Sequence, residues 1–229
     1  ITSWNDNMLN TSGMNDSCYK GANLLKNMID CFGRVRSMAH NIPLDAVYPE
    51  KMKKNVLFGG NGLLTQHGKP SYYAYSFLCR VGEYHLAHDD HAILFAGKEG
   101  NYQIVCHNCK GLNYRYYLDE QNSVLGAPGQ YFEETEPLTL EYRLTGVRNG
   151  RYILKQRLVS PENGSVQDLL RQMGAAEGIY VHSHDLEYLR QVSVPQIHLQ
   201  ETQAVNGELS IHLTIPANAI LYLHIIYQY

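Results

Sequence analysis

The segment CHNC, at Cys106–Cys109, has the spacing of thiol redox centres and of half a zinc site. A redox centre of this kind should follow a strand and open a helix, whereas this segment ends a predicted strand and runs into KGLNYRYY. A structural zinc site needs a second ligand pair, which the sequence lacks. We therefore expect two reduced thiols near a turn, with no metal or redox role.

Histidine and aspartate side chains, which are common metal ligands, cluster in two further segments. HLAHDDH contributes His85, His88, Asp89, Asp90 and His91, and HSHD contributes His182, His184 and Asp185. The first segment coincides with a predicted linker, and the second with a helix start at which Ser183 or Asp185 acts as a cap. The plainer interpretation is that both are solvated segments, and metal binding is the alternative.

Composition and charge exclude several classes of function. The 229 residues are 44% apolar, which is enough for a core, and the net charge of -3 leaves no basic stripe of the kind that binds nucleic acid. Apolar runs are far shorter than the 18 residues of a membrane span, and there is no secretory signal pattern. Five scattered cysteines favour a reducing compartment, so we expect a cytoplasmic protein.

In the first third of the chain, predicted strands and helices alternate. A short strand in ITSW precedes a helix at Ser17–Cys31, which Gly33 follows. A second strand in RVRSMA leads through a long loop to a helix that begins at Pro70 and that Gly82 is placed to end. This order is typical of the βα units of a parallel sheet or barrel.

Beyond Gly82 the pattern changes to short strands with tight turns, which predicts an antiparallel β-sandwich. The linker between the two parts is placed at EYHLAHDD, the turns in RNGR and VNGE are predicted hairpin turns, and helices are expected at SVQDLLRQM and SHDLEYLRQV. The strands are predicted at HAILFAG, NYQIVCHN, LTLEYRLT, RYILKQRLV, QIHLQETQA, ELSIHLT and AILYLHIIY.

Three segments resemble glycoside hydrolase family 39, the β-xylosidase family. LFGGNGLLTQHGKPSYYAYSFLCRVG resembles the stretch that closes its barrel, ENGSVQDLLRQMG with LEYLRQVSVPQ resembles part of its β-sandwich, and ITSWN resembles its seventh-strand motif ITEWN. The resemblance implies a mainly β chain, in which residues 1–82 are the last two βα units of a (β/α)8 barrel and residues 83–229 an antiparallel β-sandwich. Ile1 would then be a truncation point, and we expect the open barrel edge to give either a homodimer or disorder before residue 55.

The resemblance also places Ser3 where the family has its nucleophile, the glutamate of ITEWN. A retaining glycosidase uses two carboxylates about 5–5.5 Å apart, and a serine hydroxyl without an adjacent base does not replace one of them. Asp6 is the nearest carboxylate in sequence, and strand alternation would point it to the opposite face. The acid/base glutamate would lie on a strand that this chain lacks, so we assign no catalytic residue and no cofactor.

Five residues remain as candidates for binding a sugar. Trp4 suits stacking on a pyranose ring and Asn5 can bond a hydroxyl, although Trp4 could equally close the barrel mouth. In the eighth strand, Asp45 aligns with the family's aspartate, while the family's tryptophan is replaced by His40 or Asn41. A cluster of Tyr114, Tyr116, Tyr117, Tyr131 and Phe132 could stack on a sugar or a partner, or pack over the sandwich.

These features lead us to expect a degenerate glycosidase. The segment NGSVQDLLRQMG resembles AraC-type transcription regulators, which carry a family 39-like barrel and sandwich after their DNA-binding domain. The implied function is a non-catalytic module that senses xylose or xylo-oligosaccharides and contacts no nucleic acid or membrane itself. One alternative is a fragment of a family 39 retaining β-xylosidase, and another is a purely architectural module.

Overall fold

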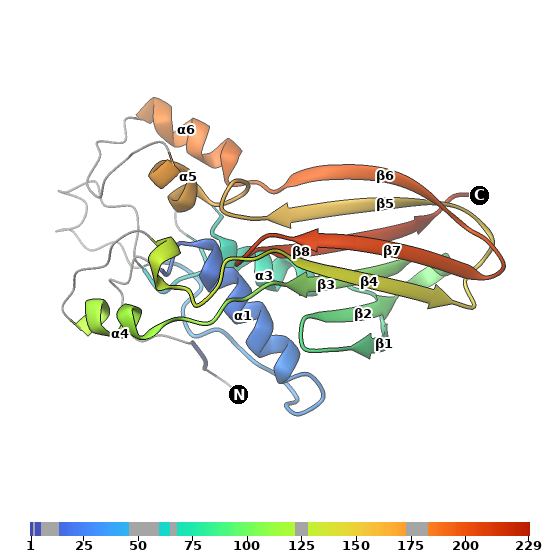
Figure 1. The fold of residues 1–229 in the computed structure, drawn as a ribbon, viewed down its shortest axis with the longest axis horizontal. Coiled ribbons are helices and arrows are strands. Elements are labelled where there is room, and N and C mark those ends of the chain that lie inside the picture. The colour runs from blue at the N-terminus through green and yellow to red at the C-terminus, as the bar shows by residue number, and fades with distance from the viewer. Residues whose placement is uncertain (2, 6–13, 46–59, 65–67, 122–127, 173–182) are drawn as a thin grey trace.

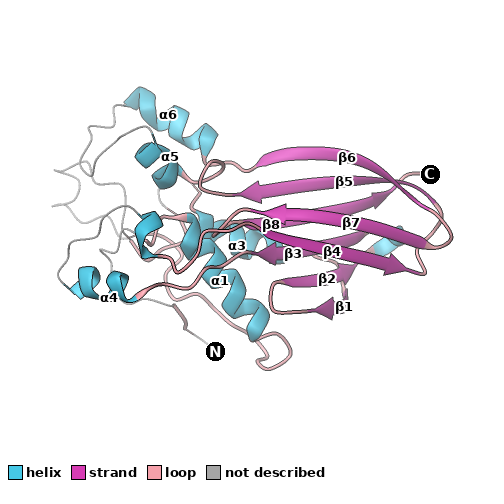
Figure 2. Cartoon of the chain, viewed as in Figure 1, coloured by secondary structure: helices cyan, strands magenta, loops and turns pink. Residues whose placement is uncertain are grey.

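The computed structural model describes residues 1, 3–5, 14–45, 60–64, 68–121, 128–172 and 183–229. Antiparallel strands dominate this part of the chain, and helices gather at one end and on one face (Figures 1 and 2). The prediction of a mainly β chain with antiparallel sheets is therefore confirmed. The helices are α1 (Cys18–Asp30), α3 (Pro70–Leu78), α4 (Tyr114–Gln121), α5 (Val166–Gln172) and α6 (Ser183–Val192), with short 3-10 turns at η1 (Lys98–Gly100) and η2 (Pro128–Tyr131).

The strands of the described residues form two sheets. A six-stranded sheet has the order β1-β2-β3-β8-β5-β6, and a second sheet pairs β4 with β7. Every pair in both sheets is antiparallel. The strands are β1 (Tyr84–His88), β2 (Ala92–Ala96), β3 (Tyr102–His107), β4 (Leu138–Thr145), β5 (Gly150–Val159), β6 (Gln196–Ala204), β7 (Glu208–Ile215) and β8 (Ile220–Tyr227).

The two sheets face each other across one apolar core. In β7 the buried and exposed side chains alternate, so that Leu209, Ile211, Leu213 and Ile215 all point inward. They share a core cluster with Ile104 and with the inward-facing residues of β5 and β8. Burial of apolar area between the sheets is thus the main stabilising term in this half of the molecule.

The two Asn-Gly turns join the sheets and do not close hairpins within one sheet. One connects β4 to β5 and the other connects β6 to β7, and each crosses from one sheet to the other. Asn206 and Gly207 have φ values of 55° and 75°, the left-handed conformation that such turns require. The amide N–H of Gly207 donates to Asn149 Oδ1 at 2.6 Å, which ties the two turns together. Turn chemistry predicts a chain reversal, but it does not determine which sheet the next strand joins.

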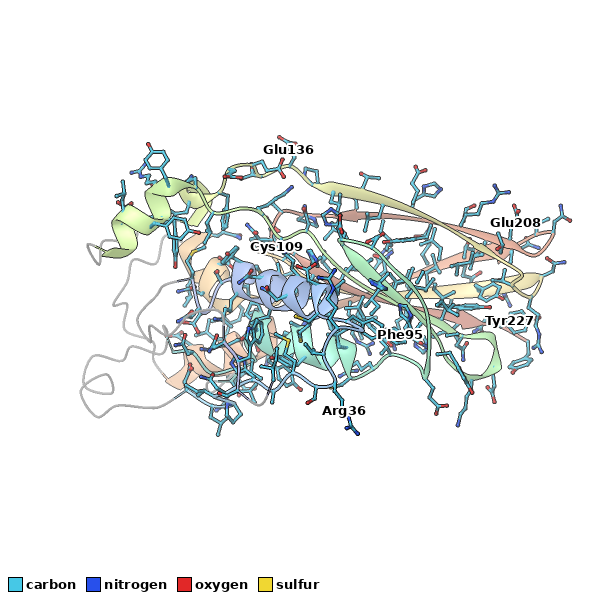
Figure 3. The ribbon with its side chains drawn as sticks, turned by 90° about the horizontal axis from the view of Figure 1, so that it is seen from below. Arg36, Phe95, Cys109, Glu136, Glu208 and Tyr227 are labelled. Atoms are coloured by element: carbon cyan, nitrogen blue, oxygen red, sulfur yellow. The ribbon has the colours of Figure 1, made fainter. Side chains whose placement is uncertain are left out.

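Helices α1 and α3 cover the outer face of the six-stranded sheet. Leu24, Leu25 and Phe77 pack in one buried cluster with Val105 and Tyr222 from β3 and β8. Figure 3 shows Phe95 and Cys109 on this same side, and both belong to or contact that cluster. Residues before Gly82 and residues after it therefore share a continuous core.

Local predictions succeed for α1, α5, α6 and the start of α3, but they miss α4 and fail at three places in the first 91 residues. Helix α1 lies within the predicted 17–31, and α3 begins at Pro70 as expected. RVRSMA is not a strand, because its backbone makes only isolated contacts. The supposed linker EYHLAHDD contains β1, and α3 ends at Leu78, short of Gly82. β1 forms a hairpin with the neighbouring strand β2, and because all its side chains are exposed no alternation marks it as a strand.

Candidate functional site

The chain start and the segment before residue 42 lie side by side in parallel. Trp4 and His40 form a parallel bridge, in which the Trp4 N–H donates to Ala39 O at 2.9 Å and the Asn41 N–H to Trp4 O at 3.1 Å. The Ala39 N–H donates to Ile1 O at 3.1 Å and continues the same register. The structure thus brings Trp4 and Asn5 beside His40 and Asn41.

Side chains of these neighbouring segments contact one another. The rings of Trp4 and His40 meet edge to face with centroids 6.5 Å apart, and His40 also packs against Tyr75 at 5.7 Å. The Asn5 amide donates to Asn41 Oδ1 at 3.3 Å. Four of the five predicted sugar-binding residues therefore lie at one place.

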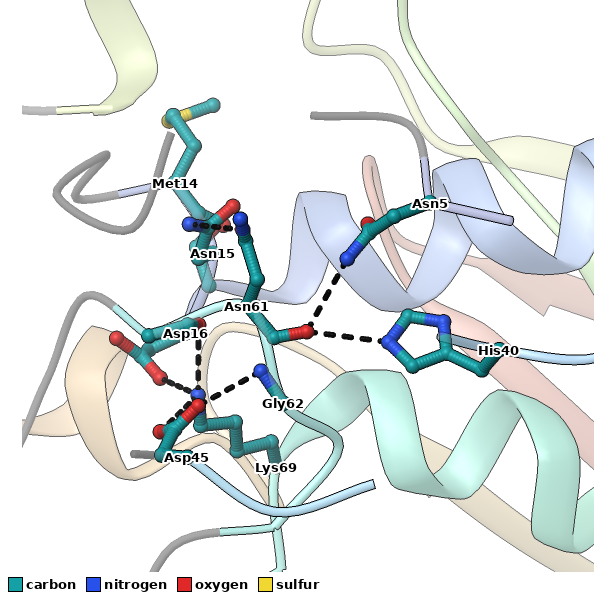
Figure 4. A network of polar contacts seen from close by, with 11 residues as sticks. Asn5, Met14, Asn15, Asp16, His40, Asp45, Asn61, Gly62 and Lys69 are labelled. Atoms are coloured by element: carbon teal, nitrogen blue, oxygen red, sulfur yellow. Dashed lines mark hydrogen bonds and ion pairs between the residues drawn. The ribbon is translucent and has the colours of Figure 1, made fainter. Parts of the chain in front are cut away.

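Asn61 is the centre of the polar network that supports them (Figure 4). Its backbone carbonyl accepts from Asn5 Nδ2 at 3.2 Å and lies 3.1 Å from His40 Nε2. Its side-chain oxygen accepts from Asn15 Nδ2 at 2.7 Å. The glycine-flanked segment around Asn61 thus fixes the orientations of Asn5 and His40.

A buried lysine joins three chain segments beneath the network through ion pairs and a hydrogen bond. Lys69, whose side chain is 1% exposed, places Nζ 2.6 Å from Asp16 Oδ1 and 2.5 Å from Asp45 Oδ2. It also donates to Gly60 O at 3.0 Å. A lysine is retained in such a position only when its charge is paired and its donors are used, as they are here.

Asp45, the fifth predicted sugar-binding residue, is held in place by this network. Besides Lys69, its carboxylate accepts from the Gly62 N–H at 2.7 Å. A Cβ at Gly60 would lie 2.2 Å from Asp45 Oδ1, and one at Gly62 would lie 2.4 Å from the Asp45 backbone nitrogen. Both glycines are therefore needed for the close approach of the two segments.

Burial sets the charge state of the groups beside this network. The Lys20 ammonium donates to Asn5 Oδ1 at 2.8 Å, and its burial, with the nearby Lys69 charge, lowers the Lys20 pKa to about 7. Burial also lowers the pKa of His40, so its imidazole is neutral at pH 7. The neutral imidazole of His40 and the amides of Asn5 and Asn41 suit hydrogen bonding to an uncharged polar ligand.

The described residues provide no catalytic pair at Ser3. Ser3 is exposed, and among the contacts of the described residues none joins its hydroxyl to an imidazole or a carboxylate. Asp16 and Asp45 are both paired with Lys69, through Asp16 Oδ1 and Asp45 Oδ2. Asp6 lies outside the described residues.

Sequence reasoning missed the residues that support the site, namely Asn15, Asp16, Lys20, Asn61 and Lys69. One usable signal is the GGNG segment, because two glycines around an asparagine indicate a close backbone approach. Lys69 has no such signal. It precedes Pro70 at the start of α3, where a lysine would ordinarily be exposed.

The other clusters are explained by packing. All five cysteines are free, and burial raises the pKa of the Cys106 thiol and raises that of Cys109 to about 12, so both thiols stay protonated. Tyr116 and Tyr131 pack in a small core with Met14, while Tyr114 and Tyr117 are exposed. His182 lies outside the described residues. No group of three or more metal-ligating side chains occurs in the part of the chain that the structure describes.

Within the same described ranges, no helix is both long and apolar enough to cross a membrane. This agrees with the short apolar runs of the sequence.

Comparison with known proteins gives a likeness of fold. No family model matches the chain, and no curated protein matches it. Among solved structures, a GH39 enzyme from Xanthomonas axonopodis pv. citri matches at TM-score 0.77 and 18% identity, over 100% of this chain and 44% of that one. A GH39 β-xylosidase from Caulobacter crescentus matches at TM-score 0.70 and 20% identity, over 99% of this chain and 44% of that one. A bacterial orthologue of human α-L-iduronidase matches at TM-score 0.65 and 9% identity, over 95% of this chain and 39% of that one.

The chain thus spans less than half the length of these solved structures, while nearly all of it is matched by them. At such low identities, what they share with it is the fold. We conclude that this chain has a fold found in glycoside hydrolase family 39 structures.

Proposed function

We propose that this chain is part of a glycoside hydrolase family 39-like protein and that Trp4, Asn5, His40 and Asn41 form one side of its sugar-binding site. The observation that carries the proposal is the parallel bridge between Trp4 and His40, which gathers these residues on neighbouring segments. An aromatic face beside amides and a neutral imidazole suits stacking on a sugar ring and bonding to its hydroxyls. The ligand class we propose is xylose or a xylo-oligosaccharide.

We further propose that residues 1–82 complete the end of a barrel and that residues 83–229 form its accessory β-sandwich. Two isolated parallel bridges, Trp4 with His40 and Leu44 with Leu64, support the first part, because neighbouring barrel strands are parallel. The two facing antiparallel sheets support the second part.

Within such a protein, this chain would bind sugar without supplying a nucleophile. Ser3 cannot act as a carboxylate, and Asp16 and Asp45 are already paired with Lys69. A second candidate is a fragment of an active β-xylosidase, which the likeness to a Caulobacter β-xylosidase favours. The regulator hypothesis depends on the NGSVQDLLRQMG resemblance alone, since the structural matches give it no support.

The test uses the longest natural protein that contains this chain. Calorimetric titration with xylose and xylobiose should show saturable binding, and Trp4→Ala should weaken it at least about tenfold by removing the stacking surface. His212→Gln, at an exposed position of β7, is the matched control and should bind as the parent does. Absence of binding by the parent protein to either sugar would overturn the proposed ligand class.

A hydrolysis assay with an aryl β-xyloside separates the two candidates. The binding module should give no turnover, and turnover by the parent protein would favour the enzyme. Ser3→Glu should restore turnover only where an acid/base carboxylate and the subsites persist elsewhere in the protein.

A further inference from the structure

A bulge in the edge strand β1 puts His85 and His88 on the same face of the sheet. In a regular strand, residues three apart point to opposite faces. Here His85 is opposite Phe95 and His88 is opposite Ile93, because the register shifts between His85 and Ala87. Phe95 and Ile93 are two residues apart and share a face, so their partners do too. The bulge thus brings the two imidazoles together.

The two rings have a defined arrangement. His88 Nδ1 lies 3.2 Å from His85 Nε2, and the ring centroids are 5.1 Å apart. Phe32, at the end of α1, packs against both rings, with centroids 4.6 Å from His85 and 5.6 Å from His88. Phe95 flanks His85 at 5.5 Å. Aromatic packing on these sides limits the rotamers of the histidines, while both residues remain exposed to solvent.

This separation is the one that two imidazoles adopt when they ligate one metal ion. Zinc–nitrogen bonds of about 2.0–2.1 Å, at angles between octahedral and tetrahedral values, place the two nitrogens about 2.9–3.4 Å apart. Imidazole nitrogen suits Zn²⁺, Ni²⁺ and Cu²⁺. The described residues supply no third ligand, so water would complete the coordination. The competing arrangement is a direct hydrogen bond, with one neutral imidazole donating to the other.

We propose that His85 and His88 form a two-histidine binding site for a divalent transition-metal ion, with Zn²⁺ as the probe. The site lies on β1, the edge strand of the six-stranded sheet (Figure 1), and shares no residue with the polar network around Asn61. A bound ion would cross-link the two sides of the bulge. It would therefore stabilise an edge strand whose one strand partner among the described residues is β2.

Calorimetric titration of the tag-free chain with Zn²⁺ tests the site. The parent should bind one ion, and His85→Gln and His88→Gln should each weaken that binding at least about tenfold, since each removes one of two ligands. Both substitutions lie on an exposed edge and should leave the fold intact by circular dichroism. His212→Gln is the matched control, because it removes an exposed strand histidine elsewhere, and it should bind Zn²⁺ as the parent does.

Electron paramagnetic resonance with one equivalent of Cu²⁺ gives an independent readout. The parent spectrum should show two nitrogen ligands, and each single variant should show one. Equal Zn²⁺ affinity in the parent and in both variants would overturn the proposal, as would no binding by the parent up to millimolar Zn²⁺. In that outcome the pair is a direct histidine–histidine hydrogen bond.

Discussion

At the scale of single residues, the most consequential side chain is the buried Lys69. It pairs with both Asp16 and Asp45, and it also donates to the Gly60 carbonyl, so three chain segments depend on one ammonium group. Removing one partner of a buried ion pair leaves an uncompensated charge, which costs far more than the loss of a surface pair.

We therefore expect Lys69→Met to lower the free energy of unfolding by about 3–5 kcal/mol, measured by urea denaturation. The control is Lys26→Met, which removes an exposed pair with Asp30 whose side chains are 45% and 42% exposed. That change should cost no more than about 0.5 kcal/mol. Comparable losses in the two variants would show that the Lys69 network contributes little.

Lys20 gives a prediction about pH. Its pKa is lowered from 10.5 to about 7, so between those values the unfolded chain binds more protons than the folded one. Stability must then rise with pH in that window, because protonation of the buried amine is costly. The parent should gain about 2 kcal/mol over Lys20→Gln between pH 7 and pH 9, measured by urea denaturation at each pH. A constant difference between the two proteins would contradict the lowered pKa.

At the scale of secondary-structure elements, Gly82 sets how α3 connects to the sheet. A Cβ at Gly82 would lie 2.2 Å from the Ala96 carbonyl oxygen, and the Gly82 N–H donates to Gln103 Oε1 at 2.9 Å. This glycine therefore permits close contact between the connection and β2, and it does not cap the helix. The same position explains why a helix-end signal was misleading here.

Gly82→Ala should lower stability by about 1–3 kcal/mol, because the added methyl group must displace backbone atoms. The matched control is Gly129→Ala, where a Cβ would meet nothing within 4 Å. Thermal unfolding should show a clear decrease in Tm for the first variant and little change for the second. Equal Tm values for Gly82→Ala and Gly129→Ala would mean that the β2 backbone shifts at little cost to accommodate the added methyl group.

Asp168 links two helices through their N-termini. Its carboxylate accepts from the Ser165 hydroxyl at 2.5 Å and from the Cys18 N–H of α1 at 2.9 Å. The Asp168 N–H donates to Ser165 Oγ at 3.5 Å, which is one of the two contacts of the predicted capping box. Asp168→Ala should therefore cost about 2 kcal/mol, roughly one for each helix end, in chemical denaturation. Asp185→Ala, an exposed first-turn aspartate of α6, should cost less than about 1 kcal/mol. Equal costs would show that Asp168 caps α5 alone.

At the scale of the whole molecule, one apolar cluster crosses the predicted domain boundary at residue 82. Leu24 and Phe77 on one side share it with Val105 and Tyr222 on the other. Such continuity favours a single cooperative unit, because α1, α3 and the outer face of the six-stranded sheet bury their apolar surface against each other.

We expect the chain to unfold in one transition. Fluorescence of Trp4, the single tryptophan, reports on the first segment, while far-ultraviolet circular dichroism reports mostly on the sheets. The two midpoints should coincide, and Leu24→Ala should lower both by the same amount, at a cost of about 2–5 kcal/mol. Two separated transitions would instead indicate independent domains on either side of residue 82.

The sequence alone was sufficient wherever a local pattern carries the information. Alternation predicted β7, the residues following Ser17 predicted α1, and Pro70 marked the start of α3, because periodicity and backbone chemistry act over a few neighbouring residues. It also suggested Trp4 and Asn5 as site residues from their side-chain types. Tertiary structure alone decided that the Asn-Gly turns join two sheets and that Lys69 pairs with Asp16 and Asp45. Strand partners and buried ion pairs depend on which distant segments meet, and no local pattern encodes that choice.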